Sequence, residues 1–433
     1  MEKTLTIQIG SRQYNSKFKL NQKLNIAISS YRSAPFGGGQ GIFVYELSRA
    51  LQSLGHNVDI ISGPPYPNLE PEINLIRSPG LNLFSTFVFK ERLAIFLSKK
   101  YKSMDDWYEF FSALFGGFPE IKTFGNRLSH LLKNSSYDIL IDNQSLSFGV
   151  LQVQNIIPVI EIVHHPITKD YKYDIKFSKG IVQKISKWRW FSFLKMQKKV
   201  APFMKAISTP SINSKNDIVK DFNVSKKKIM VIPNGIDHVN FSPKKHINRN
   251  PEQLITTASA DVPLKGLDFT LKAIHSIKKD FPKIRLVIIG APRPGGHTER
   301  LIQKLNLEEN ILYKTNLTKE EIAIEYAYSN IAIVSSLYEG FGFPVGEAMA
   351  CSIPLIATNV ASIPEITSSF AELIPEGDPN SIEHAIRKIF LNPSKYQIRA
   401  DAGRMHIIEN FDWQKIAQQY ENLIHQTMEK FKC

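Results

Sequence analysis

The chain has 433 residues but only two cysteines, Cys351 and Cys433, so disulfide bonds form no framework for its fold. Such a low cysteine content fits a reducing compartment such as the cytoplasm. No run of roughly 18 apolar residues, the length that a membrane-spanning helix needs, occurs in the sequence. The N-terminal segment also lacks the apolar core of a signal peptide and instead alternates polar and apolar residues over 4–20. We therefore expect a cytoplasmic protein in which residues 4–20 form an added hairpin.

Acidic residues are few compared with basic ones, 40 against 54, which leaves a formal net charge of +14. An excess of this size favours an anionic partner, such as nucleic acid, a phosphate-bearing substrate or a lipid surface. No known nucleic-acid-binding motif occurs, and the basic residues are spread along the chain, which argues against nucleic acid. The length exceeds what one hydrophobic core usually supports, so we predict two globular domains.

Two series of short apolar segments predict two doubly wound α/β domains. In the first, a buried strand at 24–30 precedes a glycine loop, a helix over 42–54 and a strand at 56–62, a unit that implies a parallel sheet. Further strands are predicted at 137–142, 157–163, 206–210, 229–233, 254–259, 284–290, 331–336 and 353–358. We place the domain boundary near residue 205. Ligands of such sheets bind beyond the carboxyl ends of the strands, so the cleft between the domains is the expected site.

Two loops in this cleft carry groups that suit a phosphate. The run Gly37, Gly38 and Gly39 lets the backbone approach a ligand closely, and the helix after it offers free N–H groups. Its alternative interpretation is a tight strand-to-helix turn. Lys265, in PLKG at the start of another predicted helix, can hold a diphosphate as a point charge or can simply be solvated.

The stretch EGFGFPVGEAMA places Glu339 and Glu347 on either side of a loop of glycine and aromatic residues. It follows a predicted strand, and Pro344 suits the first turn of a helix. Carboxylate oxygens only accept hydrogen bonds, so two of them suit a ligand with two polyol parts, such as a ribose and a sugar. The alternative is that both glutamates cap or solvate helix ends.

Taken together and in this order, the motifs resemble those of retaining glycosyltransferase family 4. The likeness covers most of the chain, from GGGQGIFVYELSRAL through VIPNGIDHVNFSP, PLKGLDFTLKAI and EGFGFPVGEAMA to FDWQKIAQQYENL. It implies the GT-B fold, in which two Rossmann-like domains face each other across a cleft. The first, 1–205, would bind the acceptor, and the second, 206–413, the nucleotide-sugar donor. The C-terminal helix, 414–433, would cross back to the first domain.

The resemblance also implies roles for single residues of the donor site. Glu347 matches the glutamate that holds the nucleotide ribose, and Lys265 the lysine that binds the donor diphosphate. Gly38 and Gly39 match the glycine pair that closes on that diphosphate. The family has an arginine where this chain has Ala260, and we hypothesise that Arg293 in GAPRPGG compensates for the missing guanidinium.

A second set of residues is implied to lie beside the transferred sugar. Glu339 matches the glutamate that contacts this sugar, and His164 matches a histidine next to it, with His165 as the weaker match. Backbone groups of the following loop complete the set: Gly340, Phe341, Gly342 and Phe343.

The implied reaction is transfer of a hexosyl unit from a nucleoside-diphosphate sugar to a hydroxyl acceptor, such as a glycan, a glycolipid or a small metabolite, with retention. We find no Asp-x-Asp at a strand end and no His/Cys cluster with metal spacing, so we expect no metal and no other cofactor. The alternatives are a GT-B sugar-nucleotide epimerase or a nucleotide-sugar-binding protein with weak or no transferase activity. A dinucleotide oxidoreductase is disfavoured because GGGQGIF lacks the Gly-x-Gly-x-x-Gly spacing.

Two segments of the first domain match nothing in this pattern. Residues 84–134 are aromatic and basic, and residues 176–199 combine lysines with tryptophans and phenylalanines and contain no acidic residue. Such a composition is typical of a helix at an anionic membrane, so we predict peripheral docking on the inner face of the cell membrane. Alternatively, these aromatic residues pack on the first domain.

Overall fold

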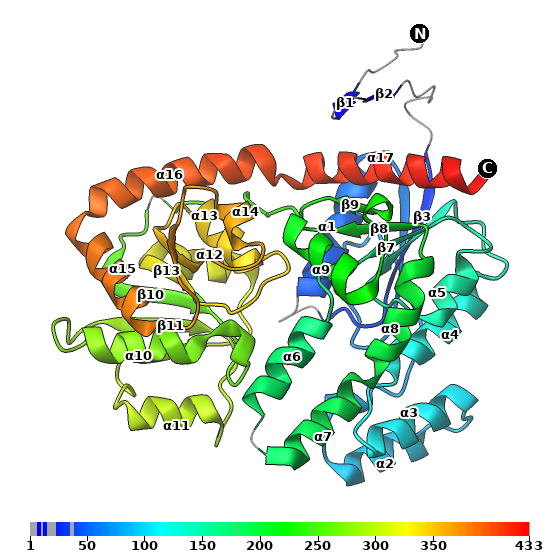
Figure 1. The fold of residues 1–433 in the computed structure, drawn as a ribbon, viewed down its shortest axis with the longest axis horizontal. Helices are drawn as coiled ribbons and strands as arrows, with labels where there is room; N and C mark the ends of the chain where they lie inside the picture. The colour runs from blue at the N-terminus through cyan, green and yellow to red at the C-terminus, as the bar shows by residue number, and fades with distance from the viewer. Residues whose placement is uncertain are drawn as a thin grey trace.

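The computed structural model describes residues 7–9, 12–14, 23–34, 39–178, 180–244 and 246–432. The described residues form two large parallel sheets, each covered by helices on both faces (Figure 1). The first sheet has the order β5-β4-β3-β6-β7-β8-β9. Its strands are β3 (Asn25–Ser30), β4 (Asn57–Ser62), β5 (Asn74–Arg77), β6 (Ile139–Asn143), β7 (Val159–Ile162), β8 (Ala206–Thr209) and β9 (Ile229–Val231).

The second sheet has the order β12-β11-β10-β13-β14-β15. Its strands are β10 (Asn250–Thr257), β11 (Arg285–Ile289), β12 (Ile311–Lys314), β13 (Ser329–Val334), β14 (Leu355–Thr358) and β15 (Glu372–Ile374). The central strands of both sheets are rich in isoleucine and almost wholly buried, as parallel strands covered on both faces must be.

One part of the predicted domain division is wrong. The prediction assigned the strands that begin at 206 and 229 to the second domain, but β8 pairs with β7 and β9 pairs with β8, all in parallel, in the first sheet. The chain crosses to the second sheet only between β9 and β10. A short apolar strand looks the same in either sheet, because its pairing partner is far away in sequence.

Helices of the first domain cover its sheet in two layers. They are α1 (Gly39–Ser53), α4 (Glu120–Leu132), α5 (Phe148–Val153), α6 (Thr168–Phe177), α7 (Gly180–Trp190), α8 (Leu194–Val200) and α9 (Ile212–Phe222). The segment 84–134 contains α2 (Phe89–Ser98), α3 (Met104–Leu114) and α4, and the 3-10 turn η1 (Leu83–Ser85) precedes α2. Outside this segment, the 3-10 turn η2 (Phe191–Phe193) follows α7 and η3 (Ala201–Phe203) follows α8. Residues 84–134 contain no strand.

The second domain carries its own helices around the six-stranded sheet. They are α10 (Leu267–Ile277), α11 (His297–Lys304), α12 (Lys319–Tyr328), α13 (Phe343–Ala350), α14 (Ile363–Thr367), α15 (Pro379–Leu391) and α16 (Pro393–Asn410), and the 3-10 turn η5 (Pro263–Lys265) precedes α10. Pro344 lies in the first turn of α13, as predicted, because a proline there removes no helix hydrogen bond.

The last helix returns to the first domain. In Figure 1, α16 runs along the second domain and α17 (Trp413–Lys432) continues over the first. Trp413, Tyr420 and Ile424 of α17 belong to the same buried cluster as Leu47 and Leu51 of α1. The predicted GT-B arrangement, including the crossing helix, is therefore present.

Near the N-terminus, β1 (Ile7–Ile9) and β2 (Arg12–Tyr14) pair as antiparallel strands, in line with the predicted hairpin. Gly37 and Gly38 of the predicted phosphate loop and the cysteine Cys433 lie outside the described residues.

Candidate active site

Lys265 and Glu339 form an ion pair at the carboxyl end of the second sheet. Lys265 Nζ lies 2.7 Å from Glu339 Oε1, which also accepts a hydrogen bond from Ser336 Oγ at 2.7 Å. The absence of a side chain at Gly266 lets η5 pack closely against this end of the sheet, because a Cβ there would lie 1.9 Å from the carbonyl oxygen of Ser335. The residues predicted to bind the diphosphate and the sugar are thus direct neighbours.

The loop 340–343 brings this edge against the first domain. A Cβ on Gly340 would lie only 2.6 Å from the His164 carbonyl oxygen, so glycine permits the two domains to touch here. The Gly340 carbonyl also accepts hydrogen bonds from Ser211 Oγ at 3.0 Å and Ser214 Oγ at 3.2 Å, both in the first domain. Gly342 has φ of +103° and caps α13.

Phe343, the last residue of the loop 340–343 and the first of α13, lies against Gly39 of α1. A Cβ on Gly39 would lie 3.5 Å from the Phe343 ring, while Phe341 is buried with its ring centroid 5.4 Å from that of Phe343. The first turn of α1 therefore packs on the loop that precedes α13, and the predicted partners of the donor lie together.

His164 and His165 follow β7 and differ in surroundings. The His164 ring lies edge-on to Phe43 at 4.8 Å, and its Nε2 is 2.8 Å from Asn143 Oδ1. Burial, with the charge of His165, lowers the pKa of His164 to about 3, so this ring stays neutral.

His165 faces the second domain. Its Nε2 lies 2.7 Å from Asp170 Oδ2, and its Nδ1 would be 2.9 Å from a Cβ on Gly340. Burial lowers the pKa of His165, but the charge and hydrogen bond of Asp170 and the charge of Glu339 outweigh it, so the net shift is upward. The ring of His164, the better sequence match to the family's histidine, thus contacts only first-domain residues in these interactions. The ring of His165 instead approaches the loop 340–343 of the second domain.

Glu347 lies in α13 and is only 9% exposed. Among the residues that the structure describes, no donor gives its carboxylate a hydrogen bond, which leaves its acceptor oxygens available to a ligand. Burial raises the pKa of Glu347 to about 7; the charge of Lys319 lowers it, and the charge of Asp237 raises it further.

Lys319 is not among the residues predicted from the sequence, yet it joins three parts of the molecule near Glu347. Its ammonium bonds Glu46 of α1, lies 3.6 Å from Asp237 Oδ2 and stands 4.8 Å above the ring of Tyr45. It occupies the first turn of α12, after the capping box of Thr318 and Glu321. The capping box indicates only that a helix starts here. It does not indicate the contact between Lys319 and Glu46 of α1.

Arg293 lies at the rim of the same edge. Its side chain is 73% exposed, and Nε is 3.7 Å from Asp261 Oδ2. Asp261, next to Ala260, accepts hydrogen bonds from the backbone N–H groups of His297 and Thr298 at the start of α11. The compensating role of Arg293 stays a prediction.

Comparison with known proteins identifies the family. Residues 37–239 match the family model described as Glycosyltransferase Family 4, and residues 239–406 match that described as Glycosyl transferases group 1. The chain is 34% identical over 403 residues to the MMP alpha-(1->4)-mannosyltransferase of Mycolicibacterium hassiacum, which covers 92% of this chain and 96% of that protein. The chain belongs to glycosyltransferase family 4.

Solved structures agree on the fold of this glycosyltransferase. It is similar to a sucrose-phosphate synthase from Thermosynechococcus elongatus, with a TM-score of 0.72, 21% identity and coverage of 94% of this chain and 100% of that one. It is also similar to HepE from Anabaena, solved in complex with UDP-glucose, with a TM-score of 0.68, 15% identity and coverage of 94% and 100%. At such identities the likeness concerns the fold, and it confirms the predicted GT-B class.

Two further observations concern the described part of the chain. None of its helices is both long and apolar enough to cross a membrane. Within the same residues, no group of three or more His, Cys, Asp or Glu side chains is arranged to hold a metal ion.

Proposed function

We propose that this glycosyltransferase moves a hexosyl unit from a nucleoside-diphosphate sugar to a hydroxyl acceptor, with retention of the anomeric configuration and without a metal ion. The observation that carries the proposal is the meeting of Lys265, Glu339 and the loop 340–343 with His165 of the first domain. Glu347 of α13, buried and without a hydrogen-bond donor among the described residues, is the proposed ligand of the ribose.

Each of these residues has a role that follows from its chemistry. The Lys265 ammonium stabilises the negative charge that develops on the leaving diphosphate as the anomeric carbon–oxygen bond breaks. The Glu347 carboxylate accepts hydrogen bonds from two neighbouring ribose hydroxyls. Glu339 exchanges its ion pair with Lys265 for hydroxyls of the transferred sugar and acts in binding, not as a nucleophile. Without a covalent intermediate, retention requires that the acceptor attack the face that the diphosphate leaves.

The relatives support the donor class. A relative that aligns over 92% of this chain is named a mannosyltransferase, and a structural neighbour was solved with UDP-glucose. Both are consistent with a nucleotide-linked hexose as the donor here. The first domain would bind the acceptor, and the exposed helix α7, within the basic segment 176–199, would contact an anionic membrane surface.

The direct test is a nucleotide-release assay with UDP-, GDP-, ADP- and dTDP-hexoses and a panel of methyl hexosides as acceptors, run with and without EDTA. We expect one donor to release nucleotide, and the anomeric proton coupling of the product to match that of the donor. Inverted product would contradict the retaining mechanism, and activity that is lost in EDTA and restored by Mg²⁺ would contradict metal independence. Conversion of the donor to an epimer without acceptor would favour the epimerase alternative.

A further inference from the structure

Helix α3 buries two carboxylates on its inner face, beside Phe110 and Ala113. Of its three acidic residues, Asp106 and Glu109 point inward and are each 1% exposed. They are neutralised there, because Lys99 Nζ lies 2.7 Å from Asp106 Oδ1 and Arg127 NH1 lies 2.9 Å from Glu109 Oε1. The capping box of Ser103 and Asp106 fixes the start of the helix in this orientation.

The opposite face of α3 presents an apolar stripe to the outside. The stripe recurs at helical spacing and consists of Met104 (84% exposed), Trp107 (43%), Tyr108 (44%), Phe111 (49%) and Phe115 (68%). A helix of a globular protein normally buries such a stripe and exposes its charges. An exposed apolar stripe of this length marks an interaction surface.

Helix α7 continues this surface. None of its described side chains is buried, and Ile181 (74% exposed), Ile185 (45%) and Trp188 (54%) share one face. The ends of α3 and α7 meet, since a Cβ on Gly116 would lie 4.0 Å from Arg189 Cβ. In Figure 1 the two helices lie at the same end of the first domain, together with α2.

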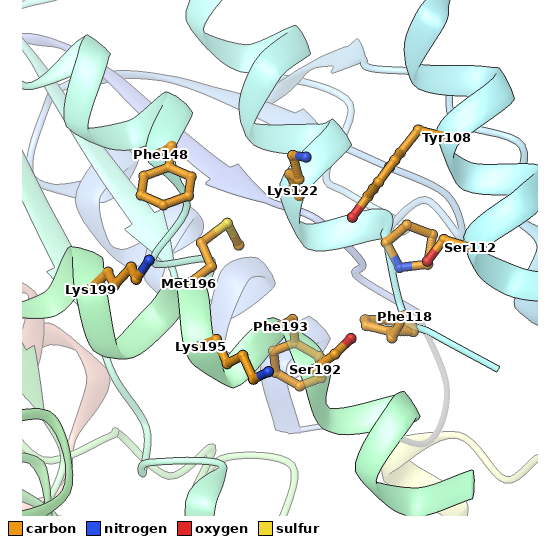
Figure 2. Close-up of a pocket in the computed structure, with 11 residues that line it drawn as sticks. Tyr108, Ser112, Phe118, Lys122, Phe148, Ser192, Phe193, Lys195, Met196 and Lys199 are labelled. Carbon is orange, nitrogen blue, oxygen red and sulfur yellow. The ribbon is translucent and has the colours of Figure 1, made fainter. Parts of the chain in front are cut away.

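A basic pocket opens beside the two helices, between α3, α4, α5 and α8 (Figure 2). Its cavity volume is about 270 Å³, and its walls carry the aromatic rings of Tyr108, Phe118, Phe148 and Phe193. Phe118 also packs on Trp190 of α7, with ring centroids 5.1 Å apart, so pocket and helix share one aromatic cluster.

Three lysines line this pocket: Lys122, Lys195 and Lys199. No lining residue is acidic, and none of the three forms an ion pair with a residue that the structure describes. The Lys122 ammonium lies 4.2 Å from the Tyr108 ring centroid and the Lys195 ammonium 5.2 Å from that of Trp188. The pocket therefore offers positive charge without an internal counter-ion.

We propose that α3, α7 and this pocket form one membrane-docking face, whose apolar stripes enter the interface of an anionic bilayer while the three lysines hold a phospholipid phosphate. Unpaired ammonium groups beside exposed aliphatic and aromatic side chains match such a bilayer, which offers both anionic headgroups and an apolar layer. A nucleic acid would use the lysines but leave the aliphatic residues of α7 exposed. The inference builds on the membrane contact proposed for 176–199 and does not depend on the transferase activity.

The test is flotation of the full chain with vesicles of phosphatidylcholine alone or with 30% phosphatidylglycerol, at low and high salt. The wild type should float with the anionic vesicles at low salt. The Phe111→Ser/Phe115→Ser variant should lower partitioning more than tenfold, and Lys195→Gln/Lys199→Gln should lower it about fivefold for each lysine. Matched controls in the second domain, Leu391→Ser/Ile398→Ser and Lys279→Gln/Lys283→Gln, should partition like the wild type, and thermal melting verifies folding.

Further results of this experiment show whether the whole membrane contact or only the present inference is wrong. Absence of wild-type flotation at low salt would overturn the whole membrane contact. A loss in Ile185→Ser/Trp188→Ser without one in the α3 and lysine variants would leave the contact of 176–199 standing and overturn the present inference. Equal losses in the second-domain controls would also overturn it. Inorganic phosphate at millimolar concentration should not displace the protein, and displacement would identify the pocket as a site for free phosphate instead of lipid.

Discussion

Glu347 shows how one residue serves ligand binding at the expense of stability. Its carboxylate is buried and receives no hydrogen bond from the described residues, so its ionised form is costly in the unliganded protein. A ribose would supply the missing donors. Burial of this carboxyl group raises the pKa of Glu347 to about 7.

We predict a pH-dependent stability difference between the wild type and Glu347→Gln. Because the folded-state pKa of Glu347 lies above its usual value, its stabilising contribution is complete at low pH and is lost as the pH rises toward 7. The variant should come within about 1 kcal/mol of the wild type at pH 5 and exceed it by about 3 kcal/mol at pH 8. Urea unfolding at both pH values measures this. A constant difference across the range would mean that Glu347 is ionised in the folded state at pH 5.

A second prediction for a single residue concerns Gly340, where the two domains touch. Alanine would place Cβ 2.6 Å from the His164 carbonyl oxygen, and because that atom is backbone, the domains must move apart. We expect Gly340→Ala to lower kcat about a hundredfold, since a displacement near 1 Å is enough for such a loss. Nucleotide affinity should change little, because Lys265 and Glu347 both belong to the second domain. Equal losses in kcat and in affinity would contradict a role in domain closure.

At the scale of elements, α1 and α12 are joined by an ion pair whose carboxylate is buried. Glu46 is 3% exposed and bonds the Lys319 ammonium across the two domains. Burial raises the pKa of Glu46, and the charge of Lys319 opposes that shift. Removing the lysine therefore leaves a buried carboxylate without its cation.

We predict that Lys319→Met destabilises the protein by about 3 kcal/mol at neutral pH and that adding Glu46→Gln recovers most of the loss. Chemical denaturation of the two single variants and the double variant gives the coupling energy. The exposed pair of Arg387 and Asp280 is the matched control, and Arg387→Met should cost less than about 1 kcal/mol. Equal effects at the two sites would show that the buried pair does not join the domains.

The elements also show what the sequence could predict. Central strands such as β3, β6 and β13 were expected because buried parallel strands form continuous apolar runs. The strands β5, β12 and β15 were missed, and each lies at the edge of its sheet, where it is short and partly exposed. The assignment of β8 and β9 to the wrong domain has a different cause, since pairing partners depend on topology and not on local composition.

At the scale of the whole molecule, several contacts between the domains lie at the carboxyl ends of the two sheets. Glu365 of the second domain accepts the backbone N–H groups of Ile212 and Asn213 at the start of α9, at 2.7 and 2.9 Å. Tyr338 donates to Asp217 Oδ2 at 2.9 Å. Together with Gly340, these contacts hold the carboxyl ends of both sheets face to face.

The candidate site was predictable where motifs are local and hidden where contacts are distant. The spacing of Glu339 and Glu347 around a glycine loop was visible in the sequence, and the structure brings Glu339 to Lys265. The contact of Lys319 with Glu46 joins residues 273 positions apart, so no local pattern revealed it. The position of His165 at the loop 340–343 likewise depends on how the two domains meet.

The measurement that tests the central claim most directly is calorimetric titration of the wild type and Glu347→Gln with UDP, GDP, ADP and dTDP, in EDTA. We predict micromolar binding of one nucleotide by the wild type and a ten- to hundredfold weaker affinity in the variant, as expected for loss of hydrogen bonds to a charged acceptor. Binding of one nucleotide with equal affinity by both proteins would contradict the ribose role of Glu347. No binding of any of the four nucleotides by the wild type would contradict the donor site itself.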